Sequence, residues 1–518
     1  MSDQTTPTEP RLVFPTSARK PRPWWRKLVS APESGLVLVV MLMAGVLTLF
    51  SGVRDAGDFT LVAVGTGTTV TSERGDLVVS TSDGALAARL NSLLKPEAGG
   101  SLILEYNGTK TALKAGRRTK LVEATEGAPA MLRIQAQVNK FLNIENMTLV
   151  GTNASYIAII AVGMTMVIAM GGIDLSVGMI WAFSALIGAI FLKHPWGEAF
   201  PSVGIIGRPW VFQVVLVTGL VALASGVVSR KLSARGARNP MLAPASTGSL
   251  IVGGVFTLVA LAAVVVAMRD VAYGDLTREP MAMSWWIAVP LGLCVCGVVG
   301  ALCGLVNGSL IVGLGVHPFI ITLGMMAVLE GVLFVLSSSQ TLTGVPDSYG
   351  AGFFKAHFAG VTPVPIFVML GVTLFGMVVL TRSVLGRRTL AIGDNEKAAM
   401  YAGIPVGRVK VTVYTLTGLL TGISGAVNLG YWQSASPTAG KGYELQVIAA
   451  AVIGGASLSG GRGSALGAVL GAILIELIGN GMVMLEIDQS YNKIVMGTAI
   501  VAAVVIDQSK NRLQRRKA

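Results

Sequence analysis

Residues 163–188 read GMTMVIAMGGIDLSVGMIWAFSALIG. Two apolar runs are separated only by GGIDLS, and each run is long and uncharged. Runs of about 18 or more apolar residues are long enough to cross the hydrocarbon core of a membrane as helices. Backbone groups without internal hydrogen bonds are costly in lipid, so these runs are predicted to be helical.

The rest of the chain repeats this pattern. Hydrophobic residues make up 52% of the 518 residues and charged residues only 13%, which indicates an integral membrane protein. The predicted spans are 35–52, 151–170, 177–193, 211–229, 249–268, 285–306, 317–337, 363–381, 411–430 and 491–506. Two shorter apolar pieces, 444–457 and 464–480, flank SLSGGRGS and are either full spans or half-helices. We therefore expect an all-α polytopic membrane protein of about 10–12 transmembrane helices with broken or re-entrant segments.

The net charge of +13 is concentrated in four polar segments rather than spread as on a nucleic-acid-binding protein. Lysine and arginine cluster in the N-terminal tail 1–34, the loop 230–247, the loop 382–410 and the tail 509–518. Short basic segments remain in the cytoplasm. Alternation from a cytoplasmic N-terminus puts all four on that side, with ten or twelve crossings and both termini cytoplasmic.

Residues 53–142, after the first predicted transmembrane helix (35–52) and before the main transmembrane domain (143–508), have a different pattern. Alternating stretches such as FTLVAV, DLVVSTS and SLILEYNG are separated by Gly, Asp and Asn, which predicts short strands. We expect a small β-rich extracytoplasmic insertion, since long loops cross the membrane largely regardless of charge. The alternative is a loosely ordered insertion.

Polar and small residues inside the apolar spans indicate special positions. An aspartate such as Asp174 costs about 3 kcal/mol at the bilayer centre. It either caps a helix hairpin together with Ser176 or belongs to a broken helix that lines a polar pathway, and both can be true. Two ladders of glycine at every fourth position provide flat faces for close helix packing. They are Gly300, Gly304 and Gly308, and Gly463, Gly467 and Gly471.

The loop 382–410, RSVLGRRTLAIGDNEKAAMYAGIPVGRVK, is too structured for a simple turn. Asp394 and Asn395 can cap a short helix that Gly403 and Pro405 then end. The apolar positions 398–400 give this helix a compact face, which is typical of a helix that binds in a groove of a partner. An ordinary connecting loop is the alternative.

Four ordered motifs resemble the permease subunit of bacterial monosaccharide ABC importers of the ribose, xylose and galactose type. They are GGIDLSVG, NGSLIVGLGVHPFIITLGMMAVLEG (307–331), GRRTLAIGDNEKAAMYAGI (386–404) and GYELQVIAAAVIGGASLSGGRGSALGAVLGA (442–472). The resemblance covers most of 143–508, apart from an insertion near 230–283. Two features depart from the family pattern: the insertion 53–142, and Glu330, where family members often carry a basic residue.

The resemblance implies import of a pentose or hexose, xylose- or ribose-like, across the bacterial inner membrane by alternating access. It implies a separate ABC ATPase that binds ATP and Mg²⁺, a periplasmic sugar-binding protein and a homodimer or paralogous second permease. The chain has no GxxxxGK[ST] phosphate loop. LSGGR at 458–462 is similar to the signature sequence of ABC ATPases, but no phosphate loop precedes it. We therefore expect a multi-pass transporter subunit that contacts lipid and no nucleic acid, with no catalytic, cofactor or metal site of its own.

Two groups of residues carry this expectation. By resemblance, the loop couples to the ATPase through Gly386, Arg387, Arg388, Ala391, Gly393, Asp394, Asn395, Ala398, Ala399 and Gly403. The solute pathway is predicted to include Asp174, Ser176, Asn307, Phe319, Thr322 and Glu444.

Other functions remain open from the sequence. A sugar symporter acting alone needs buried groups for its coupling ion, and Asp174, Glu330 and Glu476 are candidates. A channel, a receptor built around 53–142, and an ABC permease for nucleosides or amino acids are further alternatives. The three cysteines all lie in one apolar span, at 294, 296 and 303, which indicates packing rather than disulfides.

Overall fold

A computed structural model describes residues 33–193 and 283–491, together with a few positions between 494 and 505. Short gaps fall at 66, 74–75, 94–100, 115–118, 123–130 and 359–360. The predicted spans 211–229 and 249–268, the loop 230–247, the tail 509–518 and most of 491–506 lie outside the described residues.

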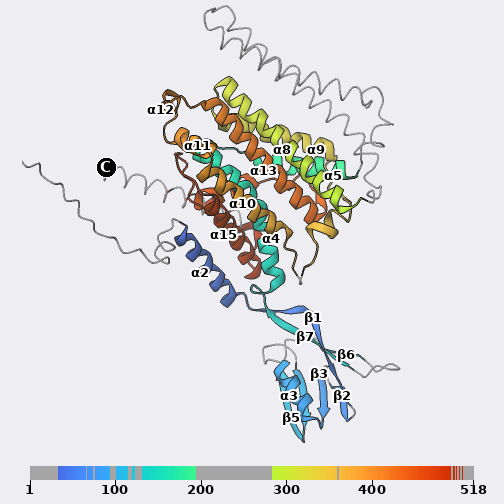
Figure 1. Cartoon of the computed structure of the whole chain (residues 1–518). Helices are drawn as coiled ribbons and strands as arrows, with labels where there is room; N and C mark the ends of the chain where they lie inside the picture. Colours follow the sequence, from blue (N-terminus) through green and yellow to red (C-terminus); the bar gives the residue numbers. More distant parts are fainter. Residues whose placement is uncertain are drawn as a thin grey trace, which may run out of the picture.

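The described part of the main domain is a bundle of helices (Figure 1). The long helices are α2 (Ser34–Phe50), α4 (Ile144–Ala169), α5 (Val177–Lys193), α8 (Trp285–Leu314), α9 (Pro318–Ser337), α10 (Val364–Arg382), α13 (Val406–Trp432) and α15 (Ala465–Met484). Shorter ones are α11 (Val384–Asp394), α12 (Glu396–Tyr401) and α14 (Tyr443–Ile453). Among the described residues, α4, α8, α9, α10 and α15 are long and apolar enough to cross a membrane. The polytopic helical prediction is confirmed.

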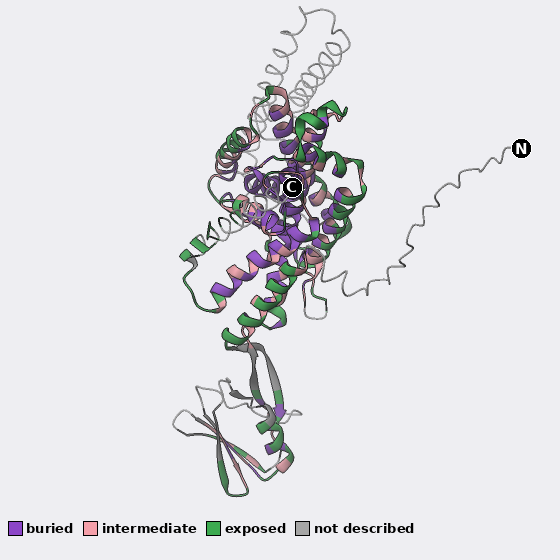
Figure 2. Cartoon of the chain, turned by 90° about the vertical axis from the view of Figure 1, so that its left-hand side faces the viewer, coloured by how far each residue is buried: buried purple, intermediate pink, exposed green. Residues whose placement is uncertain are grey.

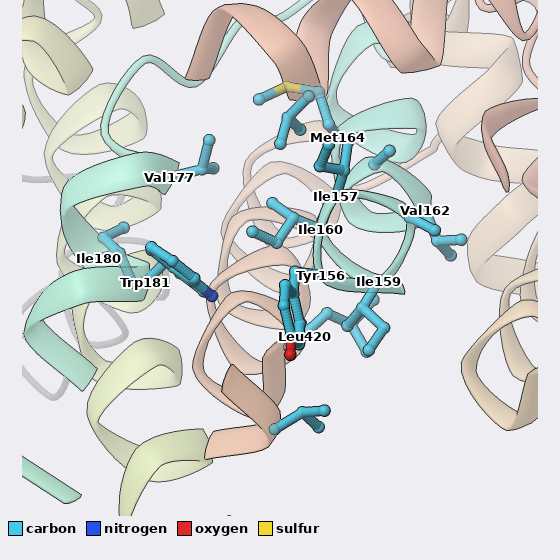
Figure 3. Packing of buried hydrophobic residues seen from close by; sticks show 14 of the residues in the cluster. Tyr156, Ile157, Ile159, Ile160, Val162, Met164, Val177, Ile180, Trp181 and Leu420 are labelled. Atoms are coloured by element: carbon cyan, nitrogen blue, oxygen red, sulfur yellow. The ribbon is translucent and has the colours of Figure 1, made fainter. Parts of the chain in front are cut away.

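Helix α4 forms the centre of the bundle. Every residue from Ala154 to Ala169 is buried, and its 26 residues extend about 39 Å, more than the ~30 Å hydrocarbon core. Figure 2 shows buried residues gathered in the middle of the bundle and exposed ones on the outer helices. In Figure 3, Tyr156 and Ile160 of α4 lie beside Trp181 of α5 and Leu420 of α13.

Contacts between helices fix their directions. Thr417 of α13 donates to the Gly163 carbonyl at 3.0 Å and Ser424 to the Tyr156 carbonyl at 2.9 Å, so α13 runs antiparallel to α4. Glu33, which precedes α2, accepts from Ser464 at the start of α15. The start of α2 and the 455–464 turn therefore lie at the same end of the bundle as α11.

The first glycine ladder is a helix-packing face, as predicted. A Cβ on Gly300 or Gly304 of α8 would overlap the Gly418 or Tyr414 carbonyl of α13. In the second ladder, Gly471 of α15 contacts the Ala450 backbone of α14, and Gly467 contacts Gly454 directly after α14. Gly463 precedes α15 and lies against α4, so the prediction of one three-residue face is wrong at this position. The close approach of these backbones requires the absence of side chains at the contact points.

The structure decides how 444–480 is organised. Helix α14 has 11 residues and extends about 16 Å, too short to cross the core, whereas α15 has 20 residues and extends about 30 Å. Gly454 and Gly455, the latter with φ +95°, end α14 before its apolar run is complete. The pair is therefore a half-helix followed by a full span.

Strands and one helix lie between α2 and α4. Two sheets form there, β1-β7-β6 and β2-β3-β4-β5, with bounds β1 Val53–Ala63, β2 Thr68–Glu73, β3 Asp76–Thr81, β4 Ser101–Tyr106, β5 Thr109–Lys114, β6 Thr119–Val122 and β7 Met131–Asn139. Helix α3 (Gly84–Leu93), which the alternation did not predict, packs its Leu86 and Leu90 with Val79 and Leu104. The placement of residues 53–142 outside the cytoplasm stays a prediction.

The strands are tied firmly to the bundle. Asn139 donates to the Thr48 carbonyl of α2 and accepts from the Phe141 and Leu142 amides before α4. Below this junction Asn146 of α4 and Asn480 of α15 exchange two buried amide hydrogen bonds of 3.1 and 2.8 Å. Figure 1 shows the strands beyond one end of α2 and α4, and α11 and α12 toward the other.

Candidate functional site

Asp174, Ser176 and Asn307 meet in the turn between α4 and α5. Asp174 Oδ1 accepts from the Ser176 amide at 2.9 Å and from the Ser176 hydroxyl at 2.6 Å. Asn307 of α8 donates to the same hydroxyl at 2.8 Å. The three residues are no more than 1% exposed, and Asn307 Oδ1 has no hydrogen-bond partner among the described residues. The structure thus joins three of the predicted pathway residues into one buried network.

This junction is a helix hairpin. Trp181 and Ala185 of α5 contact Gly425 of α13, and Gly188 contacts Leu429, so α5 runs parallel to α13 and antiparallel to α4. The two helices therefore form a hairpin, as one of the two predictions for Asp174 had it, and the carboxylate holds the turn through Ser176, which precedes α5, instead of capping the first turn of α5. A pathway role for the same residues stays a prediction.

A second polar cluster surrounds the first turn of the half-helix α14. Glu444 lies in this turn beside Gly178 at the start of α5, and its Oε2 has no hydrogen-bond partner among the described residues. Tyr443 stacks on Trp181 with ring centroids 4.5 Å apart. Lys441 Nζ lies 2.7 Å from Glu330 Oε1 of α9. The N-termini of α5 and α14 therefore meet inside the bundle.

The remaining pathway candidates lie on α9. Thr322 is buried and donates to the Pro318 carbonyl of its own helix at 3.0 Å. Phe319 is 45% exposed. An open, apolar hollow of about 520 Å³ lies elsewhere, between α8, α10 and α13, and contains none of the predicted residues.

The loop 382–410 forms two helices instead of one. Ser383 caps α11 by accepting from the Gly386 amide at 3.0 Å, and Asn395 caps α12 by accepting from the Ala398 amide at 3.0 Å. Asp394 is the last residue of α11, so the prediction that Asp394 and Asn395 together cap the helix is correct only for Asn395, which caps α12. Gly403, with φ +80°, follows α12, as predicted.

The predicted coupling residues separate into two faces. Gly386 and Ala399 are buried, whereas Arg387, Arg388, Ala391, Asp394, Asn395, Ala398 and Gly403 are exposed. The predicted apolar face at 398–400 is divided, because Ala399 packs inward while Met400 is 57% exposed. Tyr401, which the sequence interpretation did not single out, is 85% exposed beside it.

Gly393 lies at the point where this loop contacts the bundle. A Cβ there would overlap the Ala169 carbonyl at the end of α4 and approach the Gly461 amide at 2.6 Å. Gly461 itself donates to the Ala169 carbonyl at 2.8 Å. The end of α11, the end of α4 and the turn before α15 therefore share one backbone-to-backbone contact.

Sequence reasoning missed Lys441, Trp181 and Tyr443 as site residues. The only available signal for Lys441 was a lysine between two glycines directly before an apolar run. Glu330 and Glu476 were candidates for the coupling ion of a symporter; in the structure Glu330 pairs with Lys441, and Glu476 accepts from Asn153 at 3.0 Å.

Comparisons with known proteins all match permease components of transport systems. The family model described as "Branched-chain amino acid transport system / permease component" matches residues 245–504. The ribose import permease protein RbsC of Bacillus subtilis is 43% identical over 206 residues, which cover 40% of this chain and 64% of that protein. The D-allose transport system permease protein AlsC of Escherichia coli is 38% identical over 211 residues, covering 41% and 64%.

The fructose import permease protein FrcC of Rhizobium meliloti is 34% identical over 275 residues, which cover 50% of this chain and 74% of that protein. The matches to RbsC of B. subtilis and AlsC thus span slightly less than two thirds of those relatives. No solved structure matches. The chain belongs to the family of permease subunits of monosaccharide ABC importers.

Proposed function

We propose that this chain is the permease subunit of an ATP-driven importer that moves a pentose or hexose by alternating access. A separate ATPase binds ATP and Mg²⁺ and docks on the 382–410 loop, and a periplasmic sugar-binding protein delivers the solute. Two copies of the chain, or this chain and a paralogue, form the pathway in the bacterial inner membrane, with both termini in the cytoplasm.

The contact at Gly393 is the observation that carries this proposal. Helix α12 exposes Met400 and Tyr401 in a polar loop, where apolar exposure favours a protein partner. Force applied to α12 reaches α11 directly, and α11 meets α4 through backbone atoms with no flexible side chain between them. A displacement of the loop therefore acts on the helix that ends beside the Asp174 turn.

The same contacts suggest how the chain changes state. The Asp174, Ser176 and Asn307 network joins the α4–α5 turn to α8, and Gly440 joins the start of α5 to the segment before α14. Movement of α4 would shift the two helix N-termini that meet inside the bundle. Closing one side of this junction while opening the other is the rearrangement that alternating access requires.

The solute class is proposed from the relatives. The printed names of the similar permeases specify ribose, D-allose and fructose. The description of the matching family specifies branched-chain amino acids, so an amino-acid permease is the second candidate within the same machinery. The names of the three relatives favour the sugar, and the unpaired Glu444 oxygen can accept a hydrogen bond from one of its hydroxyl groups.

Co-purification tests the ATPase partnership. The chain is co-expressed with a candidate ABC ATPase subunit and captured in detergent. We expect the wild type to retain the ATPase, and Met400→Asp with Tyr401→Asp to lose most of it, because two carboxylates would be buried in an apolar contact. Leu61→Asp, at a 51% exposed position of β1, is the matched control and should retain it. Equal retention by the double variant and the control would contradict docking through α12.

A further inference from the structure

A charged pair joins Glu330, in the interior of α9, to Lys441, which lies just before α14. Glu330 is 12 residues beyond Pro318 in the 20-residue helix, or about 18 Å along its axis. Its partner Lys441 lies 2.7 Å away and 6.0 Å from the Phe334 ring centroid. The side chains remain 58% (Lys441) and 30% (Glu330) exposed.

Such a pair does not face lipid. A charged side chain at membrane depth costs about 2.5–3.5 kcal/mol on insertion scales, and such residues normally face a water-filled cavity or the bundle interior. The surface of α9 at Glu330 and Lys441 is therefore the wall of an aqueous space. This distinguishes it from the equally exposed but wholly apolar surface of α10, at Phe367, Leu370 and Leu374.

Two residues after Lys441, the half-buried Tyr443 forms an aromatic pair with the buried Trp181, which has an unused donor. Trp181 is 3% exposed and stacks on Tyr443, the first residue of α14. Its indole nitrogen has no hydrogen-bond partner among the described residues and points from α5 toward the centre of the bundle (Figure 3). An unpaired buried donor costs about 1–3 kcal/mol, so this position favours a ligand or water that accepts its proton.

Glu444 supplies the complementary acceptor. It lies in the same turn as Tyr443, and its Oε2 is buried without a donor. The N-terminus of the 11-residue α14 packs against the start of α5, where Gly440 and Glu444 lie beside Gly178. Donors, acceptors and a flat aromatic surface are thus assembled around one helix start.

We propose that the first turn of α14 is the solute-binding site of the permease, formed by Trp181, Glu330, Lys441, Tyr443 and Glu444. The fitting ligand is a neutral polyhydroxylated molecule. Its hydroxyl groups donate to Glu330 and Glu444 and accept from Lys441 and the Trp181 N–H, and its apolar ring face packs on the aromatic pair. The inference rests on the proposed function, because it names the site at which that importer holds its solute.

Thiol labelling of the full chain in proteoliposomes tests the aqueous wall. Lys441→Cys is made in a background of Cys294→Ser, Cys296→Ala and Cys303→Ala, with Leu370→Cys, 53% exposed in the native chain, as the matched control. A charged, water-soluble methanethiosulfonate should modify position 441 but not 370. Ribose, D-allose or fructose at millimolar concentration should slow that modification.

Either of two other labelling results would overturn the proposed solute-binding site. Position 441 reacting no faster than 370 would place the pair away from water, and modification that none of the three sugars slows would remove the solute contact. The experiment needs neither ATP nor the ATPase. Its failure therefore refutes this site and leaves the importer proposal, which co-purification tests, in place.

Trp181→Phe gives a second, independent measurement. This change keeps an aromatic ring against Tyr443 and removes only the indole N–H. We expect the KM for sugar uptake to rise about three- to tenfold, the range of one hydrogen bond, with kcat changed much less. Trp285→Phe is the control. Trp285 is the first residue of α8 and its ring stacks on Phe353, so this change should leave KM unchanged. An unchanged KM in Trp181→Phe would mean that the N–H does not bind the solute.

Discussion

At the scale of single residues, the chain depends on positions where a side chain is absent. Gly393 lets the end of α11 touch the Ala169 carbonyl and the Gly461 amide. Gly178 lets the start of α5 touch the Gly440 carbonyl. Gly393 was named from the sequence because it matches the family pattern. Its contacts with Ala169 and Gly461 join segments more than 60 residues apart, so no local periodicity predicts these contacts.

Gly393→Ala should uncouple the ATPase from transport. The added methyl overlaps backbone atoms that cannot rotate away, and overpacking of this kind costs roughly 1–3 kcal/mol. Where that cost falls on one of the two transport states, the balance between them shifts about 5–150-fold. We expect reduced sugar uptake per ATP hydrolysed, measured in proteoliposomes with the ATPase present.

Gly324→Ala on α9 is the control, because a Cβ there meets no atom within 4 Å. Thermal unfolding in detergent shows whether Gly393→Ala still folds. A folded Gly393→Ala protein with the wild-type ratio of uptake to ATP hydrolysis would refute the coupling role of this contact.

At the scale of elements, sequence patterns predicted helix caps and stops that depend on neighbouring residues, and missed features that depend on packing between distant segments. The cap at Asn395 and the stop at Gly403 follow from residue type, and both are present. Helix α11 was not predicted, because the sequence interpretation placed only one short helix, after Asp394 and Asn395, in this loop; in the structure Ser383 caps α11, and Thr389 and Ile392 bury one face of it. The length of α14 could not be read from its apolar run, since packing against α15 and the two glycines after Ile453 set its end.

The α8–α13 contact gives a test at this scale. Gly304→Leu places a branched side chain against the Tyr414 carbonyl and the Thr415 backbone. We expect the two helices to separate and the protein to lose most of its accumulation in the membrane, because backbone contact between them is replaced by a clash. Accumulation is measured by size-exclusion chromatography of a fluorescent fusion.

Gly313→Leu, on the same helix with no atom within 4 Å of its Cβ position, should behave as the wild type. Equal yields of monodisperse protein from Gly304→Leu and Gly313→Leu would show that the ladder is not a packing face.

At the scale of the whole molecule, α4 links its two ends. One end follows the strands and is held through Asn139 and Asn146, and the other touches Gly393. The placement of basic loops predicted a common side for the N-terminal segment and the 382–410 loop. In the described part of the chain, Glu33 and α11 do lie at one end, through Ser464 and Gly461.

This arrangement predicts opposite labelling of two surface lysines. Lys110→Cys in β5 should react with a membrane-impermeant maleimide on spheroplasts, whereas Lys397→Cys in α12 should react only after permeabilisation. Both are made in the cysteine-replaced background. Labelling of both positions from the same side would refute the expected topology, in which the strands are extracytoplasmic and α12 is cytoplasmic.

The most direct test of the account is uptake driven from one defined energy source. The chain, its ATPase and its binding protein are reconstituted in liposomes, and entry of radiolabelled ribose, D-allose or fructose is followed. We predict uptake of at least one sugar only when ATP and Mg²⁺ are present on the side of the 382–410 loop, and none from a proton or sodium gradient alone. Uptake by the chain alone, driven by an ion gradient without ATP, would contradict the account.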